Sequence, residues 1–393
     1  MNGAPPTIYD VAATAGVSIA SVSRVLNGTG SPRADTRERV LRAVAELGFV
    51  PDGAARALSV KLKETVGVVY RRVPKATSAA VFAEEDENLQ FADIINRGIE
   101  VAAQRSGFSL LISSVAAEDA DARRRMLALA GKCDGLIVHD LVLDSDQLDR
   151  LGRQVPVVNL AGITTPHTAS VRGDSETGMR DLMRHLTRDH GYRSLGYLAG
   201  VADSPDNVTR RAVVTAEARA AGAELATGPE WQGSYYADGG ASVIDALAGA
   251  GRALPRAIVC ANDLAAVGAL HALARHGVDV PRSVAVTGFD DIPVARRLRP
   301  GLTTVRQPIQ ELGATAFELL ESLVRNRQPE PRDVVLPTQL IRRESCGCLR
   351  EARLTGVPPA GTSGVPADGQ RRGLAEHEPP GRGRMIGVEP QAR

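Results

Sequence analysis

A short segment near the N-terminus carries side chains suited to contacts with a DNA duplex. The run IASVSRVL, from Ile19 to Leu26, is expected to form a helix that exposes Arg24 among small hydroxyl groups. A guanidinium can donate two parallel hydrogen bonds to O6 and N7 of guanine, and short polar side chains suit phosphate oxygens. Ile19 and Ala20 have no polar side-chain atoms, so they can sense only thymine methyls or DNA shape. The candidate contacts are Ser18, Ile19, Ala20, Ser21, Ser23, Arg24 and Asn27. The same segment also fits a solvated surface helix that Ser18 merely caps.

Residues 7–48 are predicted to form three short helices that hold this segment in place. Thr7 is suited to cap the first helix, Gly16 ends it, and Ser18 is suited to cap the second. The turn is so short that the two helices must cross steeply. A third helix, beginning near Asp35, is expected to support both. Two capped helices joined by a tight glycine-containing turn describe a helix-turn-helix unit.

The body, residues 66–345, alternates short apolar runs with segments of helical periodicity. The runs are VGVVY, SLLIS, GLIVH, VPVVNL, SLGYLAG, AIVCAND and VAVTGFD. Continuous apolar runs are typical of parallel strands covered by helices on both faces. We therefore expect an α/β fold, in which a small all-α head precedes two doubly wound parallel-sheet lobes. Ligands of such folds bind at the carboxyl ends of the strands, here between the lobes.

The composition of the 393-residue chain is typical of a cytoplasmic protein. No apolar run is long enough to span a membrane, and the N-terminus lacks a secretory pattern. Four cysteines are too few for a disulfide framework. Residues 1–63 carry eight Lys or Arg against five Asp or Glu, a net +3 that permits contact with nucleic acid. Residues 350–393, with eight Gly and six Pro, are expected to be disordered.

The string TIYDVAATAGVSIASVSRVLNGTGSPRADTRERVLRAVAELGFVP closely resembles the headpiece of LacI/GalR-type bacterial transcription repressors. In the body, AIVCANDLAAVGAL, VAVTGFDDIPVARRLRPGLTTVRQP and LPTQLIRRES resemble the effector-binding core of the same family. The resemblance covers about residues 7–346. It implies a homodimeric repressor with periplasmic-binding-protein-like lobes, which binds double-stranded operator DNA and a small-molecule effector. The expected parts are a DNA-binding headpiece (7–50), a hinge (51–64), a two-lobe core for effector binding and dimerisation (65–346) and the tail (350–393).

The resemblance also assigns roles in DNA binding. Ile19 and Ala20 would set operator preference, and Arg24 would make a contact common in the family. In relatives the hinge becomes helical only on operator DNA; here Ala55 and Leu58 are the expected hinge contacts, with Leu58 a wedge in the minor groove. A two-turn helix is marginal in water, and Gly53 weakens it by about 1 kcal/mol, so DNA must order it. The alternative is a passive linker with Leu58 packed on the body.

The resemblance implies six effector contacts, which are Phe91, Asn207, Arg211, Asn262, Asp290 and Gln307. A guanidinium, an amide and a carboxylate that converge from strand ends can hold neighbouring hydroxyls of a sugar or a nucleoside. Structural alternatives stay open: Asp263 looks like a helix N-cap, Asp291 can pair with Arg296 or Arg297, and an arginine near a helix start usually lies on the surface. Two departures from the family leave the effector's identity open. The loop between residues 70 and 91 is longer than usual, and Ala161 stands where many relatives carry an aspartate. A sugar is the expected class, and the effector's sign, inducing or corepressing, is also open.

Other chemistry is not expected. Cys346 and Cys348 form a Cys-x-Cys pair, but a zinc site needs two further ligands, and the histidines are scattered without His-x-x-x-His spacing. We therefore predict no metal and no cofactor. No nucleophile elbow or phosphate-binding loop is present, so the chain is predicted not to be an enzyme. A transporter's solute-binding protein shares the two-lobe body, but it requires a secretion signal and no DNA-reading head.

Overall fold

The structure, a computed structural model, describes most of the chain up to residue 348. The described residues are 6–28, 30–50, 62–72, 90–116, 122–327, 329 and 331–348. The expected hinge contacts Ala55 and Leu58, the loop residues 73–89 and the whole tail (350–393) lie outside these ranges. By internal contacts the chain divides into two units, Met1–Arg350 and Glu351–Arg393. None of the described helices combines the length and apolar character that crossing a membrane requires.

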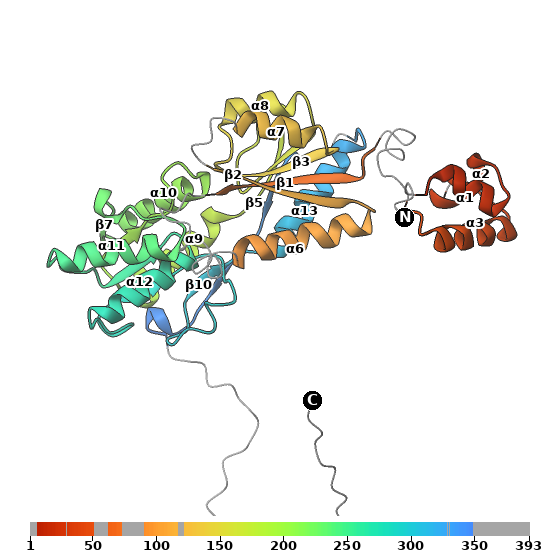
Figure 1. The fold of residues 1–393 in the computed structure, drawn as a ribbon. Helices are drawn as coiled ribbons and strands as arrows, with labels where there is room; N and C mark the ends of the chain where they lie inside the picture. Colours follow the sequence, from red (N-terminus) through yellow and green to blue (C-terminus); the bar gives the residue numbers. More distant parts are fainter. Residues whose placement is uncertain are drawn as a thin grey trace, which may run out of the picture. The chain divides into compact units, whose positions relative to one another are not determined.

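Three helices form the head and confirm the predicted helix-turn-helix (Figure 1). They are α1 (Ile8–Ala15), α2 (Ile19–Leu26) and α3 (Ala34–Leu47). Thr7 and Asp10 form a capping box that satisfies backbone N–H groups at the start of α1. Gly16 ends α1 with φ of 62°, a left-handed conformation that glycine adopts without strain. The apolar faces of the helices, including Val22 and Val40, meet in a small core of their own.

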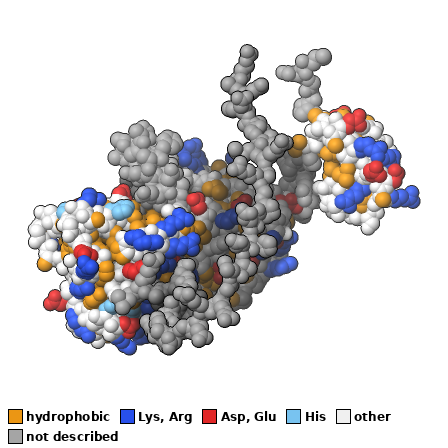
Figure 2. All heavy atoms as spheres, turned by 90° about the horizontal axis from the view of Figure 1, so that it is seen from below, with side chains coloured by type: hydrophobic (Ala, Val, Ile, Leu, Met, Phe, Trp, Pro, Cys, Tyr) orange, Lys and Arg blue, Asp and Glu red, His pale blue; other side chains and the backbone are white. Residues whose placement is uncertain are grey.

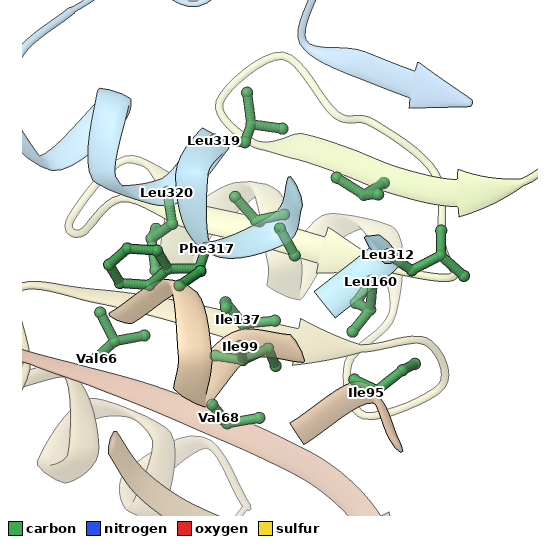
Figure 3. Close-up of a cluster of buried hydrophobic side chains, with 14 of the residues drawn as sticks. Val66, Val68, Ile95, Ile99, Ile137, Leu160, Leu312, Phe317, Leu319 and Leu320 are labelled. Carbon is green, nitrogen blue, oxygen red and sulfur yellow. The ribbon is translucent and has the colours of Figure 1, made fainter. Parts of the chain in front are cut away.

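The first lobe is built on a six-stranded sheet with the order β11-β5-β4-β3-β1-β2, in which all neighbours are parallel. Its strands are β1 (Thr65–Arg72), β2 (Ser109–Ala116), β3 (Gly135–His139), β4 (Val157–Leu160), β5 (Ala169–Gly173) and β11 (Asp333–Leu336). Its helices are α6 (Gln90–Arg105), α7 (Ala122–Ala130), α8 (Ser145–Gly152) and α13 (Ile309–Val324). Side chains of α6 and α13, such as Ile99 and Phe317, meet Val66 and Ile137 of the sheet in the core (Figure 3).

The second lobe has a four-stranded parallel sheet with the order β7-β6-β8-β9. Its strands are β6 (Ser194–Leu198), β7 (Glu224–Ala226), β8 (Ala257–Cys260) and β9 (Ala285–Thr287). Its main helices are α9 (Ser175–Arg184), α10 (Pro205–Ala220), α11 (Ala237–Gly249) and α12 (Asp263–Arg275). A π-helical turn (His185–Asp189) extends α9, and short 3₁₀ turns cover Pro229–Trp231 and Glu344–Cys346. The predicted α/β fold with parallel sheets is thus confirmed.

The lobes are not consecutive in the chain, because α13 and β11 return to the first lobe after the second sheet is complete. A separate antiparallel pair, β10 (Thr304–Arg306) and β12 (Gln339–Ile341), flanks this return. The returning helix packs closely on α6: a Cβ on Gly98 would lie 2.0 Å from the Gln310 carbonyl oxygen, and one on Gly313 would lie 2.2 Å from that of Ile95. Glycine therefore allows the two helix backbones to touch.

Candidate DNA-binding and effector sites

The helix α2 is held rigidly by its cap and by its buried face. The Ser18 hydroxyl accepts a hydrogen bond from the Ser21 backbone N–H at 3.2 Å, and the two hydroxyls lie 2.9 Å apart. Val22 and Val25 point into the core of the head, with 0% and 8% exposure. Ser18 is therefore a genuine N-cap, and the opposite face of the helix is directed outward.

The predicted DNA contacts lie on this outward side. Ile19 is 40% exposed, and Ser18, Ala20 and Arg24 are also exposed. Ser21, Ser23 and Asn27 are half-buried, and the Asn27 amide donates to the Ser23 hydroxyl at 3.2 Å. An exposed guanidinium beside small side chains leaves the helix free to approach a base edge closely.

A hollow of about 300 Å³ opens beside Arg24. Its walls are Ser21, Arg24, Gly30, Ser31, Pro32, Arg33 and Thr36. Arg33 is the N-cap position of α3 and makes no side-chain cap, so backbone N–H groups of the first turn keep their capacity to bind an anion. Arginine side chains also lie on the face of the head seen in Figure 2. Arg33 was not predicted from the sequence, because a residue between helices has no periodic pattern to mark it.

In the second lobe, a buried arginine joins the ends of the strands. Arg210 on α10 is 2% exposed and donates to the Ser175 hydroxyl at 3.1 Å and to the Ala261 carbonyl at 2.7 Å. It also donates to the Asp206 carboxylate at 3.0 Å, and its guanidinium lies 3.7 Å from the centre of the Phe289 ring. Ala261 and Phe289 follow β8 and β9. Arg210 therefore lies at the carboxyl ends of these strands, which is where α/β folds of this kind bind their ligands.

Arg211 was predicted at this place from the sequence, but its neighbour Arg210 lies there instead. Arg211 is half-buried and donates to the Gln232 side chain at 2.9 Å. Successive residues of an α-helix point about 100° apart, so only one of two adjacent arginines can face the strand ends. Spacing from the preceding strand was too coarse a guide to choose between them.

Two of the predicted effector contacts, Asp290 and Gln307, lie side by side. The Gln307 amide donates to the Asp290 carboxylate at 2.7 Å, and both side chains are 5% exposed. Burial raises the pKa of Asp290 well above its usual range, and the nearby Arg210 partly opposes that rise. Asp290 also has φ of 126°, a strained conformation for a residue with a side chain. Such strain is common at binding sites, where the surrounding structure holds it.

The two predicted asparagines are engaged by the protein itself. Asn207 accepts hydrogen bonds from the Tyr197 hydroxyl at 3.0 Å and the Gly200 backbone at 2.9 Å. Asn262 accepts one from the Ala265 backbone at 3.0 Å, as the N-cap of α12. Their carbonyl oxygens therefore position the loops after β6 and β8.

Two neighbouring carboxylates have partners that differ from those expected. The cap of α12 is Asn262, so Asp263 is not the cap; its side chain is fully buried behind the start of the helix. Asp291 forms ion pairs with Arg306 and Arg343, at 2.7 and 2.5 Å, rather than with the arginines that follow it in sequence. Both carboxylates stabilise the wall of the site, because each has protein partners in the second lobe.

Hydrogen bonds also connect the two lobes. The Ser204 hydroxyl, in the loop before α10, donates to Asp140 after β3 at 2.9 Å, and the Tyr235 hydroxyl donates to Ser204 at 2.9 Å. Burial and the neighbouring Asp206 raise the pKa of Asp140 to about 7. Phe91, the predicted contact from the first lobe, packs partly buried against that lobe's core.

A groove of about 560 Å³ runs along α10. It is lined by Ala202, Asn207, Val208, Arg211, Ala212, Thr215, Ala216 and Arg219. Two of the six predicted effector contacts, Asn207 and Arg211, line this groove. The other four are not among the described residues that line it. The predicted set is therefore divided: Asn207 and Arg211 line this groove, Asn262, Asp290 and Gln307 lie near the strand ends of the second lobe, and Phe91 packs on the first lobe.

Comparison with known proteins decides the family. Residues 7–52 match bacterial regulatory proteins of the lacI family, and residues 183–346 match the periplasmic binding protein-like domain. The HTH-type transcriptional regulator GalS of Salmonella typhimurium is 33% identical over 353 residues, which cover 88% of this chain and 98% of GalS. The chain belongs to the LacI family. The family resemblance predicted from the sequence is confirmed.

Solved structures of LacI-family proteins share the fold. The Lac repressor dimer bound to operator and the anti-inducer ONPF is similar with a TM-score of 0.74 and 27% identity, covering 87% of this chain and 99% of that one. The CelR–cellobiose complex is similar with a TM-score of 0.61 and 30% identity, covering 86% and 99%. The repressor PurR of Photobacterium profundum is 31% identical over 348 residues, 86% of this chain and 98% of PurR.

Proposed function

We propose that this LacI-family protein is a transcription repressor that binds a palindromic operator as a homodimer, with an affinity set by a small molecule between its lobes. The observation that carries the proposal is the capped helix α2, which presents Arg24 outward while Val22 and Val25 fix its orientation. A rigid helix with an exposed guanidinium near small side chains suits base reading in the major groove. The hollow beside Arg24 suits a phosphate next to the bases read.

The dimer follows from the head's small size. One helix reads only a few base pairs, and two heads related by a two-fold axis read a palindromic site. The Lac repressor neighbour is described as a dimer bound to operator. Ala55 and Leu58 remain candidates for contacts at the centre of the operator.

A hydroxylated small molecule, most simply a sugar, is the proposed effector. Arg210 supplies donors, and Asp290 with Gln307 supplies acceptors and a further donor at the strand ends. One relative in structure is a complex with cellobiose. A ligand that bridges these groups and the first lobe would change the lobe contacts at Asp140 and Ser204. By linkage, effector and operator must change each other's affinity by the same factor.

Selection from random duplex DNA tests the proposal. Purified full-length protein is expected to enrich a sequence with two inverted half-sites. Addition of sugars and nucleosides, one at a time, is then expected to shift the affinity for that duplex. Failure to enrich any duplex, with or without these compounds, would refute the repressor assignment.

A variant separates the two sites. Asp290→Asn is expected to lose the response to the effector while binding the selected duplex as the wild type does. Asp245→Asn, which alters a surface carboxylate paired with Arg275, is the matched control and should keep both properties. Equal loss of DNA binding and effector response in Asp290→Asn would contradict the assigned roles.

A further inference from the structure

Four potential metal ligands from two distant parts of the chain meet in the second lobe. They are His185, His190, Cys346 and Cys348, and one ligand atom from each lies within 4.8 Å of all the others. The pair of histidines follows α9, whereas the pair of cysteines ends the described chain. No metal was predicted here from the sequence, because no two further ligands could be assigned to the Cys-x-Cys pair.

Five of the six separations between these atoms are close to those in a tetrahedral zinc site. The two sulfurs lie 3.5 Å apart, and the two Nε2 atoms lie 3.1 Å apart. His185 Nε2 is 3.5 Å from Cys346 Sγ and 3.4 Å from Cys348 Sγ, and His190 Nε2 is 3.4 Å from Cys348 Sγ. A tetrahedral zinc ion with bonds of about 2.3 Å to sulfur and about 2.0 Å to nitrogen separates its ligands by about 3.8 Å (S–S), about 3.5 Å (S–N) and about 3.3 Å (N–N). These five separations lie within about 0.3 Å of that geometry, so a small outward shift of the ligand atoms would admit an ion.

The local backbone explains how the ligands converge. His185 and His190 are five residues apart, a spacing that would place them on different sides of an α-helix. The π-helical turn bonds the His190 N–H to the His185 carbonyl at 3.2 Å and so brings both rings to the same side. Between the cysteines, Gly347 has φ of 99°, which only glycine adopts easily. That turn directs both sulfurs toward the histidines.

The surroundings of the cluster also suit a metal. His185 Nδ1 lies 2.8 Å from the Asp189 carboxylate, so an Nδ1–H that donates to this carboxylate orients Nε2 toward the ion. The Thr303 hydroxyl donates to Cys346 Sγ at 3.1 Å, a contact that stabilises a thiolate. His185 is 4% exposed and Cys346 is 0% exposed. One Zn²⁺ with two thiolates and two neutral imidazoles carries no net charge, so burying the site avoids the desolvation cost of a net charge.

We infer that His185, His190, Cys346 and Cys348 form a structural Cys₂His₂ zinc site that fastens the C-terminal end of the core to the end of α9. Four protein ligands close the coordination sphere, which is the arrangement of structural rather than catalytic zinc. The two thiols lose their protons to solvent when the ion binds. The clamp holds the segment after β12 against the second lobe, far along the chain from the DNA-reading head.

Zinc analysis of the full-length protein tests the site. Protein purified with a reductant and without chelator is expected to contain about one zinc ion per chain by elemental mass spectrometry. Cys348→Ser and His190→Gln should each lose most of it, whereas the controls His271→Gln, on the exposed face of α12, and Cys133→Ala, in the first lobe, should retain it. Zinc retained in Cys348→Ser and His190→Gln would overturn the proposal.

Cobalt titration keeps the test decisive if a variant fails to fold. Wild-type protein stripped of metal should bind Co²⁺ with the visible bands of a tetrahedral site and thiolate-to-cobalt charge transfer, and zinc should displace it. Stripping should also lower the melting temperature of the wild type, and added zinc should restore it. No zinc and no tetrahedral cobalt spectrum would overturn the proposal, as would a Cys346–Cys348 disulfide in protein kept reduced. None of these readouts depends on operator or effector binding.

Discussion

The head and the second lobe prepare their binding groups in opposite ways. In the head, Arg24 is exposed and makes no hydrogen bond to the described residues. In the second lobe, Arg210 is buried and makes three, to a hydroxyl, a carbonyl and a carboxylate. The first guanidinium adds bonds when its partner arrives, whereas the second must exchange bonds that it already has.

The difference implies different energetic roles for two residues of the same type. An exposed arginine contributes little to stability, so its removal affects mainly the complex. A buried arginine compensates carboxylates that cannot be solvated, so its removal affects the folded protein itself. The network around Arg210 also gives the effector a means to act, since any exchange of its bonds changes how α9, α10 and the strand ends are held together.

The largest expected effect is on stability at Arg210. Arg210→Ala leaves Asp206 and Asp290 without their buried cation and should lower the free energy of unfolding by about 3–5 kcal/mol. Urea unfolding followed by circular dichroism measures this value. Arg211→Ala is the matched control, because Arg211 bonds only to Gln232 at the surface of α10, and it should change stability by less than about 1 kcal/mol. A greater loss in Arg211→Ala would show that the wrong arginine supports the strand ends.

The second expected effect is on pH dependence at the contact between the lobes. The pKa of Asp140 is raised to about 7 by burial, so the native state holds a proton that the unfolded chain releases near its usual range of about 4. Native stability should therefore fall as pH rises from about 4 to about 7, by at most about 4 kcal/mol from this group. Asp140→Asn should remove this part of the slope, because its amide oxygen can still accept the bond from Ser204. Unfolding free energies measured across that interval check it, and an unchanged slope would contradict it.

The head could be predicted in detail because its signals are local. Thr7, Gly16 and Ser18 mark helix ends within a few residues of one another, and the structure has each in the predicted role. In the lobes, most strands were recognisable as apolar runs, but the return of α13 and β11 to the first lobe was not. That return depends on contacts between residues as distant as Gly98 and Gln310, and no local pattern encodes such a contact.

The location of the candidate binding site could be predicted from the sequence, but not every side chain that lies there. Strand ends located Asn262 and Asp290, but the direction of a helix decided between Arg210 and Arg211. The Cys₂His₂ cluster was missed for a related reason. Residues five apart, such as His185 and His190, lie on the same side only in a π-helical turn, and no sequence pattern predicted that turn.

The third expected effect is on DNA affinity at Arg24. Arg24→Ala should weaken binding to the selected duplex by about 1–3 kcal/mol and leave binding to a scrambled duplex nearly unchanged. Stability should not change, because the side chain is exposed. Arg42→Ala is the control: Arg42 is paired with Glu38 on α3 and should affect the two duplexes alike. Titrations at one fixed salt concentration measure both affinities. An equal loss on both duplexes in Arg24→Ala would make Arg24 a phosphate contact.

The smallest expected effect separates capping from DNA contact at Ser18. Ser18→Ala removes the bond to the Ser21 N–H and should lower the stability of the head by about 1 kcal/mol. Ser18→Asp can still cap α2 and should keep that stability, but its negative charge faces the phosphates and should weaken binding to every duplex. Thermal unfolding of the head and DNA titrations together measure the two properties. If Ser18→Asp binds DNA as the wild type does, Ser18 is a cap alone, and the DNA-contacting surface of α2 begins at Ile19.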